Sequence, residues 1–347
     1  MTSEAKIALA LTAITALVAW GLTAIVLRVA MRHRMYDVPS DRSLHSVPTP
    51  RGGGLAIALT VLTVIAGTGV LGWFSPPVTI ALLGGSVLVA VVGWLDDLRP
   101  LSPLLRIAVQ SVAVAWFIAW MGGFPILRLS GEPVSFGAAG TILAFLAMLW
   151  SINLYNFMDG IDGLAAGQAV VAGALATFTL LPGEPGLGFS TAGIAGASLG
   201  FLRGNWPPAR IFMGDVGSGL LGFLFGALAL LSSLSDHGPP LLAWVLFGGV
   251  FVFDSTVTLV RRILRGDRFY QAHREHAYQR LVRSGWSHRR TTVAALVLAA
   301  LVGGIGVVTT LLPDLALWAS LLAIVVLLAA YLFIEKRSPF RFTSPEA

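Results

Sequence analysis

Eleven long apolar runs dominate the sequence and constrain the fold it can adopt. They lie at approximately 7–27, 54–72, 78–95, 104–121, 139–155, 164–181, 188–202, 216–234, 240–260, 291–312 and 315–334. About 20 apolar residues suffice to cross the hydrocarbon core of a bilayer as a helix. Hydrophobic residues make up 56% of the 347 residues and charged residues only 12%. The sequence therefore predicts an all-α polytopic membrane protein with about eleven transmembrane helices.

These runs follow one another without a long soluble insertion, which predicts one integral-membrane domain over residues 1–335 and a tail over 336–347. The first run could be mistaken for a signal peptide. It is long, its flank contains Glu4 and Lys6 instead of a basic cluster, and no small-residue cleavage site follows. We therefore interpret it as the first transmembrane helix.

The basic residues are distributed unequally between the two sides of the membrane. If the connections alternate between sides, one side receives 21 of the 23 lysines and arginines, and the other receives only Lys6 and Arg128. Cytoplasmic connections of membrane proteins carry the excess of positive charge. This asymmetry predicts an N-terminus outside, a C-terminus in the cytoplasm and a cytoplasmic location for the polar loops described next.

A polar stretch interrupts the apolar chain between two of the runs. Asn153, Asn156, Asp159 and Asp162 follow one another at intervals of three residues, and this spacing predicts that they share one face of a helix. A polar loop that only caps a helix needs one Asn or Asp residue. Four such residues in register beside two glycines are more than capping requires. Polar groups beside a membrane span are costly and point to a functional site.

Two further acidic segments lie on the predicted cytoplasmic side. Asp96 and Asp97 end the third run, where negative charge opposes the helix dipole, so simple solvated helix-end acids explain the pair poorly. Adjacent carboxylates suit a general base or a position beside a metal ion. Asp215 stands between glycines at a predicted helix start, where an acidic side chain can approach a bound ion closely.

Basic residues accompany these acids. Arg51 precedes Gly52, Gly53 and Gly54 at a predicted helix start, an arrangement that can hold a phosphate but often reflects packing alone. The loop from residue 261 to 290 contains the sequence His273-Arg274-Glu275-His276. Zinc is an alternative for these histidines, although the His-Glu-x-x-His spacing and cysteines are both lacking. A basic loop over phosphates fits the composition better.

Together these segments place many oxygen ligands on one side of the membrane. The set comprises Asp96, Asp97, Asp159, Asp162, Asp215 and Asn156. Such ligands bind hard divalent cations, and Mg²⁺ is the usual partner of phosphates. The sequence has no Walker loop, nucleophile elbow or cysteine nucleophile. It predicts metal-assisted phosphoryl transfer at the membrane surface between a lipid and a soluble substrate.

The segments, in this order and at this spacing, resemble the polyprenyl-phosphate N-acetylhexosamine-1-phosphate transferases of the glycosyltransferase 4 family. The resemblance covers roughly residues 1–335 and rests on Asp96-Asp97, residues 153–163, residues 212–218 and the histidine loop. The phospho-N-acetylmuramoyl-pentapeptide transferase branch typically has three consecutive histidines in that loop. The sequence His273-Arg-Glu-His276 is more similar to the branch that initiates O-antigen synthesis.

The resemblance implies transfer of HexNAc-1-phosphate from a UDP-HexNAc of GlcNAc, FucNAc or QuiNAc type to undecaprenyl phosphate. The products would be undecaprenyl-diphosphate-HexNAc and UMP, at the start of O-antigen, lipopolysaccharide or other cell-surface glycan synthesis. It implies a multi-pass protein of the bacterial inner membrane in contact with membrane lipid, without a nucleic-acid partner, and it is compatible with a homodimer. Peptidoglycan synthesis remains the alternative within the family.

The resemblance also implies roles for individual residues. Mg²⁺, for which Mn²⁺ can substitute, would be held by Asp215 with Asn156 as a second ligand. Asp96 or Asp97 would be catalytic and deprotonate the lipid phosphate, although an aspartyl-phosphate intermediate stays open. The remaining residues would bind the nucleotide sugar or its phosphates: Asn153, Asp159, Asp162, Asn205, His273, Arg274, His276 and Arg51.

Two functions from other classes remain alternatives. An anionic-lipid transporter would carry ionisable groups near the midplane, whereas only Asp254 lies inside a run away from the acidic face. An inactive scaffold of a glycan-assembly complex would not need the full set of acids. Release of UMP from a UDP-sugar would distinguish the transferase from both.

Overall fold

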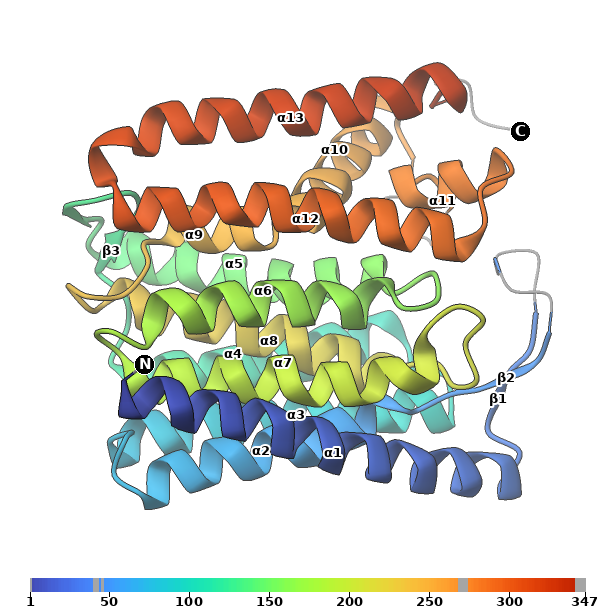
Figure 1. Ribbon diagram of the computed structural model, residues 1–347, viewed down its shortest axis with the longest axis horizontal. Coiled ribbons are helices and arrows are strands. Elements are labelled where there is room, and N and C mark those ends of the chain that lie inside the picture. Colours follow the sequence, from blue (N-terminus) through green and yellow to red (C-terminus); the bar gives the residue numbers. More distant parts are fainter. Residues whose placement is uncertain (1, 40–43, 45–46, 268–273, 341–347) are drawn as a thin grey trace.

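The computed structural model describes residues 2–39, 44, 47–267 and 274–340. In this part of the chain thirteen α-helices form a bundle in which most helices run side by side (Figure 1). The helices are α1 Ser3–Arg32, α2 Gly54–Val70, α3 Pro76–Leu98, α4 Pro103–Met121, α5 Ala138–Met158, α6 Leu164–Leu180, α7 Pro185–Asn205, α8 Asp215–Ser233, α9 Leu241–Phe247, α10 Gly249–Arg265, α11 Ala277–Arg283, α12 His288–Leu311 and α13 Ala316–Arg337. A 3₁₀ turn, Pro313–Leu315, precedes α13. The predicted all-α fold is confirmed.

Two short antiparallel ribbons complete the described structure. Strands β1 (Tyr36–Asp37) and β2 (Thr49–Pro50) pair at one end of the bundle. Strands β3 (Ile126–Arg128) and β4 (Pro133–Ser135) pair as a hairpin between α4 and α5. The alternation around Gly131 predicts a hairpin at residues 126–136, and this prediction is confirmed.

Seven of the described helices are long and apolar enough to cross a membrane, and α9 with α10 would add an eighth if this bent pair is one span. Helices α2 and α6 are apolar but have only 17 residues each. The protein is therefore a multi-pass membrane protein, while eleven crossings and their orientation stay predictions. Helix α1 begins at the end of the bundle opposite to the end where α13 finishes (Figure 1).

Local signals in the sequence explain where several helices begin and end. Proline occupies the first turns of α3, α4 and α7, where its missing N–H costs no helical hydrogen bond. The Ser102 hydroxyl accepts a hydrogen bond from the Leu105 amide at 3.2 Å and caps α4. Gly122 ends the same helix in a left-handed conformation with φ of 74°.

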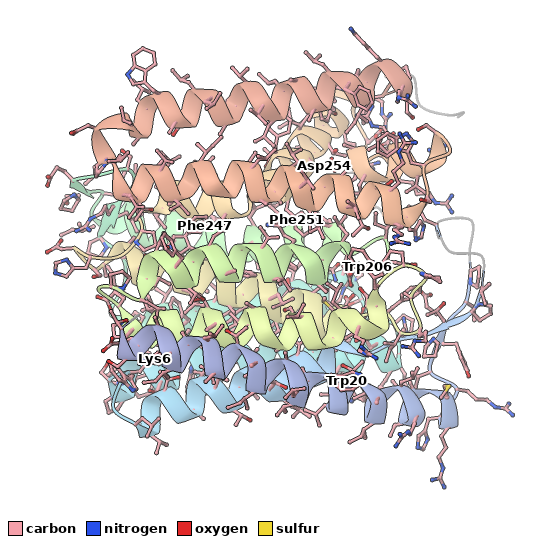
Figure 2. The ribbon with its side chains drawn as sticks, in the orientation of Figure 1. Lys6, Trp20, Trp206, Phe247, Phe251 and Asp254 are labelled. Carbon is pink, nitrogen blue, oxygen red and sulfur yellow. The ribbon has the colours of Figure 1, made fainter. Side chains whose placement is uncertain are left out.

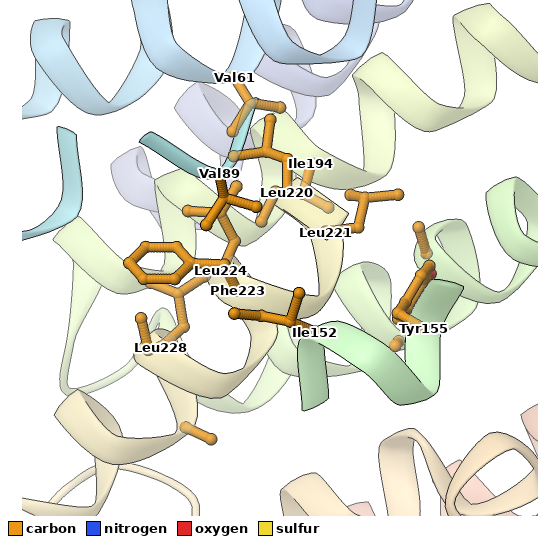
Figure 3. Packing of buried hydrophobic residues seen from close by; sticks show 14 of the residues in the cluster. Val61, Val89, Ile152, Tyr155, Ile194, Leu220, Leu221, Phe223, Leu224 and Leu228 are labelled. Atoms are coloured by element: carbon orange, nitrogen blue, oxygen red, sulfur yellow. The ribbon is translucent and has the colours of Figure 1, made fainter. Parts of the chain in front are cut away.

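Helix α8 forms the centre of the bundle. Its most apolar window is 83% buried, against 22% for the corresponding windows of α1, α4 and α13. Figure 3 shows Leu220, Leu224 and their neighbours on α8 packed against side chains of α2, α3, α5 and α7. The outer helices carry many exposed leucine, isoleucine and valine side chains, which suits contact with lipid. The start of α8 is thus anchored by packing on several sides.

Close helix contact explains the composition of α7, which covers the predicted run at 188–202. Helix α7 packs along α1 and α6, and a methyl group at Gly200 would lie 2.1 Å from the Ala16 carbonyl oxygen of α1. Small residues permit such close approach of two helix backbones. The run is weakly apolar because its glycines, alanines and serines serve packing within the protein.

The structure corrects two predictions about continuity. The run at 240–260 is not one helix, because α9 and α10 meet at an angle of 84° around Gly248 and Gly249. Paired glycines have low helix propensity and are a common cause of sharp bends. Helix α5 ends at Met158, so Asp159 and Asp162 lie in the following turn and do not share a helix face with Asn153 and Asn156.

Candidate active site

Loops from distant parts of the sequence meet at the end of the bundle that carries β1, β2 and α11 (Figure 1). The Phe212 amide donates to the Pro50 carbonyl at 2.8 Å, and the Gly53 amide donates to the Phe212 carbonyl at 2.9 Å. The Gly163 amide donates to Asn205 Oδ1 at 2.9 Å. Trp206 marks this end, and Lys6 lies at the opposite end (Figure 2). All the predicted acidic segments therefore share one end of the bundle.

Asp97 connects the end of α3 to the start of α8. Its two carboxylate oxygens accept hydrogen bonds from the Asp215 amide at 3.0 Å and the Val216 amide at 3.2 Å. These amides belong to the first turn of α8, which has no helical partner for them. The Asp97 residue is only 4% exposed. Asp97 thus holds the first turn of α8, and with it Asp215, in place.

Arg106 lies between two carboxylates that come from different helices. Its Nη1 donates to Asp96 Oδ2 at 3.2 Å and to Asp215 Oδ2 at 2.8 Å. Asp96 also accepts the Leu101 amide through Oδ1 at 2.6 Å. The Asp96 and Asp215 side chains are 16% and 27% exposed, so both remain accessible from the loop side.

Asn156 approaches Asp215 from α5. Its amide nitrogen donates to Asp215 Oδ1 at 2.8 Å and to the Ser218 hydroxyl at 3.0 Å. Gly214 precedes Asp215 with φ of 76°, and a Cβ at this position would lie 2.4 Å from Asp97 Oδ2. Glycine adopts this conformation without steric cost and leaves room for the carboxylate. Glycine at position 214 therefore lets the Asp97 carboxylate reach the backbone amides at the start of α8.

A polar cavity of about 210 Å³ lies at the same end of the bundle. Asp162 forms part of its wall, accepts the Ala209 amide through Oδ2 at 3.0 Å and pairs with His288 across 3.2 Å. Asn205 is 3% exposed and joins two loops. Its Oδ1 accepts the Gly163 amide, and its Nδ2 donates to the Ile211 carbonyl at 2.9 Å. The other lining residues are Asp37, Leu44, Asp159, Gly160, Ile161, Phe212, Gln279 and His288.

Asp159 connects this cavity to the carboxylate cluster. Burial raises the pKa of its carboxyl well above the ordinary value, and the negative charges of Asp215, Asp97 and Asp162 raise that pKa further. The charges of Asp97, Asp162 and Asp215 are therefore close enough to Asp159 to act on its carboxyl group. Such an environment favours binding of a cation among them.

Helix α11 supports the loop that carries Asp159. The buried Asp254 on α10 accepts hydrogen bonds from the Ala277 amide at 2.8 Å and the Tyr278 amide at 3.4 Å, at the start of α11. Figure 2 shows Asp254 on the part of α10 that approaches this end of the bundle. The Tyr278 hydroxyl in turn donates to the Phe157 carbonyl at 3.0 Å, two residues before Asp159. The one acid inside an apolar run therefore serves to position α11.

The other predicted site residues have mixed positions. Arg51 lies close enough to Asp97 for their charges to interact. His276 is 3% exposed, caps α11 and faces Asp254 across 3.6 Å. Arg274 is partly buried and His273 lies outside the described residues. Asn153 bonds to Gln110 on α4 at 3.1 Å and does not line the polar cavity.

The carboxylates fit the requirements of a hard divalent cation. Asp96 and Asp215 present oxygen atoms toward a single positive charge, that of Arg106, and carboxylate oxygens are the ligands that Mg²⁺ prefers. Within the described residues no group of three or more His, Cys, Asp or Glu side chains is close enough to form a complete metal site. Mg²⁺ usually completes its shell with water and substrate phosphates, so a partial protein site suits it.

Comparison with known proteins agrees with this chemistry. The chain is 32% identical to the probable undecaprenyl-phosphate N-acetylglucosaminyl 1-phosphate transferase of Bacillus subtilis (strain 168), over 88% of this chain and 85% of the relative. Residues 79–233 also match the profile of glycosyl transferase family 4. The chain belongs to glycosyl transferase family 4. This region of the family 4 chain contains the α3 acids, the α5–α6 turn and the start of α8.

Relatives of this family 4 chain come from two branches. It is 32% identical to the decaprenyl-phosphate N-acetylglucosaminephosphotransferase of Mycobacterium leprae (strain TN), over 82% of this chain and 79% of the relative. It is 31% identical to the phospho-N-acetylmuramoyl-pentapeptide-transferase of Geobacillus thermodenitrificans (strain NG80-2), over 75% of this chain and 83% of the relative. The N-acetylglucosamine relatives thus match a larger part of the chain.

Sequence reasoning missed Arg106 and His288. Arg106 is the only charged residue of the run at 104–121, and that isolation was a usable signal. In the sequence it nevertheless counts only as one more positive charge on the cytoplasmic side. His288 gives no such signal, because its partner Asp162 is 126 positions away and the contact exists only in the folded chain.

Proposed function

We propose that the protein transfers HexNAc-1-phosphate from a UDP-HexNAc to undecaprenyl phosphate and releases UMP. The observation that carries this proposal is the sharing of Arg106 by Asp96 and Asp215 beside the polar cavity. The arrangement combines a candidate base, a candidate metal ligand and a fixed cation within one site. Transfer of a phosphoryl group requires this combination of positioning and charge neutralisation.

Asp96 is the stronger candidate for the base. It is adjacent to the cluster, its side chain is 16% exposed, and its Oδ2 shares Arg106 with Asp215. Asp97 is buried, and both of its oxygens accept backbone hydrogen bonds from α8. We therefore assign proton removal from the lipid phosphate to Asp96. Asp97 positions Asp215 through the first turn of α8.

Asp215 is the metal ligand in this proposal, and Asn156 holds its carboxylate in the required orientation. Mg²⁺, when bound, supplies charge neutralisation on the diphosphate of the nucleotide sugar. Asp96 lies across Arg106 from Asp215, so the acceptor phosphate would approach from the side of α3 and α4. Arg106 orients that phosphate by its positive charge. The oxygen of the lipid phosphate attacks the sugar-linked phosphorus, and UMP leaves.

The polar cavity lined by Asp159, Asp162 and Asn205 is the candidate subsite for the uridine and sugar groups. Its volume of about 210 Å³ is smaller than a typical ligand pocket, so it would hold one part of the donor. His273 and Arg274 remain the proposed partners of the donor phosphates, whereas the buried His276 supports their loop as the cap of α11. The proposed location is the bacterial inner membrane, as the names and sources of the relatives suggest.

A donor of the N-acetylglucosamine type is favoured over the pentapeptide donor of peptidoglycan synthesis. Relatives named for N-acetylglucosamine match 82–92% of the chain, and those named for the pentapeptide match 75–78%. The loop sequence His-Arg-Glu-His supports the same choice.

The test is release of UMP by the purified full-length protein. UDP-GlcNAc, UDP-FucNAc, UDP-QuiNAc and UDP-MurNAc-pentapeptide are each incubated with Mg²⁺ and undecaprenyl phosphate, and the lipid products are identified by mass spectrometry. Undecaprenol without phosphate is the control acceptor, and Asp314→Asn, at an exposed acid of the 3₁₀ turn, is the control variant. We expect a diphosphate-linked lipid from a HexNAc donor. Product from the pentapeptide donor alone would select the peptidoglycan alternative, and no product from any donor would favour a transporter.

A further inference from the structure

His288, the first residue of α12, forms part of the wall of the polar cavity. Its Nδ1 lies 3.2 Å from Asp162 Oδ1, and its side chain is 17% exposed. The Thr292 hydroxyl, one turn later on α12, donates to the Asp162 carbonyl at 2.7 Å. Two contacts therefore join the start of α12 to Asp162 and hold the His288 ring at the cavity.

The second ring nitrogen of His288 is available to a ligand. Among the residues that the structure describes, Nε2 has no hydrogen-bond partner, and it is not one of the fully buried polar atoms that lack a partner. A carboxylate at Nδ1 of a neutral imidazole places the proton on that nitrogen, so Nε2 is an acceptor. His288 therefore offers the cavity an acceptor for an N–H or O–H group.

Gln279, on α11, offers the opposite polarity from another wall of the cavity. Its Oε1 accepts the His276 amide at 3.2 Å as part of the cap of α11, and this bond orients the side-chain amide. The amide group also lies beside the Tyr278 hydroxyl. An amide nitrogen has two hydrogens, so one N–H remains for a ligand even when the other is directed to Tyr278.

Two other polar residues of the cavity wall are already engaged with the protein. Asn205 uses both atoms of its side-chain amide for backbone groups. Asp162 accepts the Ala209 amide through Oδ2 and faces His288 through Oδ1. These two side chains hold the walls in place, so recognition of a ligand depends more on His288 and Gln279.

The charge of the cavity selects the part of a nucleotide sugar that it can hold. Its walls include Asp37, Asp159 and Asp162, and the described residues that line it include no arginine or lysine. Like charges repel, so the diphosphate is disfavoured there and a neutral group is favoured. The uracil ring and the hexosamine are both neutral, and each has an N–H or O–H group close to an acceptor oxygen.

We propose that His288 and Gln279 recognise a neutral group of the nucleotide sugar, His288 by accepting a hydrogen bond and Gln279 by donating one. This inference rests on the proposed function and assigns its donor specificity to the starts of α11 and α12. In uracil the partners are the imide N–H and an adjacent carbonyl, and in the hexosamine they are a hydroxyl and a neighbouring oxygen. Asp162 is then a positioning residue that acts through His288.

The experiment measures binding of UDP-GlcNAc to the full-length protein by isothermal titration calorimetry in the presence of Mg²⁺, without reference to turnover. His288→Asn keeps an amide near the position of Nδ1, facing Asp162, but has no atom at Nε2. His288→Gln keeps an amide near Nε2 and gives up the contact with Asp162. We expect His288→Asn to weaken binding about 10-fold and His288→Gln to weaken it less. A purely structural role of His288 predicts the reverse order, which would overturn its assignment.

Gln279→Glu tests the second hydrogen bond and identifies the group that is recognised. Glutamate keeps an acceptor for the His276 amide but replaces the N–H donor with an acceptor. If the pair recognises uracil, the native protein should bind UMP about 10-fold more tightly than CMP, and Gln279→Glu should narrow this preference, because a carboxylate accepts from the cytosine amino group. If the pair recognises the sugar, Gln279→Glu should bind UMP normally but lose the tighter binding of UDP-GlcNAc relative to UDP.

Ser284→Ala is the matched control, because Ser284 is exposed at the end of α11 and does not line the cavity. It should bind every ligand normally. The thermal transition of each variant shows whether it is folded, and Gln279→Glu provides the test if a His288 variant is not. Normal binding of UDP-GlcNAc by His288→Asn and Gln279→Glu would overturn the inference and leave the transferase intact. Absence of nucleotide binding by the native protein would instead contradict the proposed function.

Discussion

Replacing each acid of the Asp96-Asp97 pair separately should produce two different defects. The two acids have different surroundings: Asp97 accepts hydrogen bonds from the first turn of α8, and Asp96 accepts one from Arg106. Asparagine has nearly the same shape as aspartate but only one acceptor oxygen and no charge. The variants Asp97→Asn and Asp96→Asn therefore separate support of α8 from proton removal.

The cost of Asp97→Asn follows from its contacts. One of two charge-assisted hydrogen bonds to the first turn of α8 is lost, which costs about 1.5–3 kcal/mol. Loss of the negative charge at a helix N-terminus costs up to about 2 kcal/mol in a partly buried site. Together these reduce the free energy of unfolding by about 1.5–5 kcal/mol. From the usual scaling of the unfolding entropy with chain length, the thermal transition should fall by roughly 2–7 °C.

The two variants should also differ in how turnover responds to pH. A shift of about 1 Å in Asp215 would reduce turnover by about 10²-fold in Asp97→Asn at every pH. Loss of a general base in Asp96→Asn should cost about 10²–10⁴-fold near pH 6. The second pKa of a phosphate monoester is about 6, so at higher pH the acceptor ionises without a base and part of this loss should be recovered.

The assay measures UMP release from pH 6 to 9 and the thermal transition by tryptophan fluorescence, with Asp314→Asn as the control. Recovery at high pH in Asp97→Asn instead of Asp96→Asn would reverse the two assignments. A pH-independent loss in both variants, with no change in the transition temperature of Asp97→Asn, would refute the reasoning from the contacts of α8.

The remaining perturbations concern the metal ligand, Arg106, the buried Asp159 and the membrane topology. Asp215→Asn should reduce turnover by more than about 10²-fold at any Mg²⁺ concentration, because even indirect supports of a metal ligand contribute up to that factor; recovery at high Mg²⁺ would contradict its role. Arg106→Gln should lower turnover but tighten Mn²⁺ binding measured by electron paramagnetic resonance, since the two carboxylates lose a competing cation; unchanged Mn²⁺ affinity would exclude a shared cation site. The pKa of the Asp159 carboxyl is raised in the folded protein, so the folded state keeps its proton at pH values where the unfolded chain has lost it. The folded protein therefore loses stability as pH rises above about 4, the ordinary pKa of aspartate. Asparagine at this position cannot ionise, so the gain in thermal transition temperature of Asp159→Asn over the native protein should be larger at pH 8 than at pH 5. Ser102→Cys should be shielded from an impermeant reagent added outside intact cells and Ser130→Cys should react, and outside labelling of the former would refute the eleven-span orientation.

The acids of the site were predictable because each lies where an apolar run ends. Asp97 follows a run that must cross the membrane, and Asp215 begins another, so both are confined to the membrane surface. Their separate roles were not predictable. Asp97 bonds to backbone amides 118 and 119 residues later, and nothing in the local sequence indicates which acid of the pair does so.

The bend between α9 and α10 illustrates a second limit. The run at 240–260 has the length and composition of one span, and the Gly248-Gly249 pair permits a bend without requiring it. The bend turns α10 so that Asp254 meets the start of α11. This contact explains an acid that the sequence left as an exception within an apolar run.

The sequence by itself determined the membrane-embedded helical class, the acid-rich end of the molecule and the resemblance to a family of transferases. These properties depend on composition and on the order of residues along the chain, because the cost of placing charge in hydrocarbon acts on each segment separately. Only the tertiary structure decided that Arg106 joins Asp96 to Asp215 and that Asp97 holds the first turn of α8. Those features are contacts between segments that are far apart in sequence, and such contacts depend on how side chains of neighbouring helices pack.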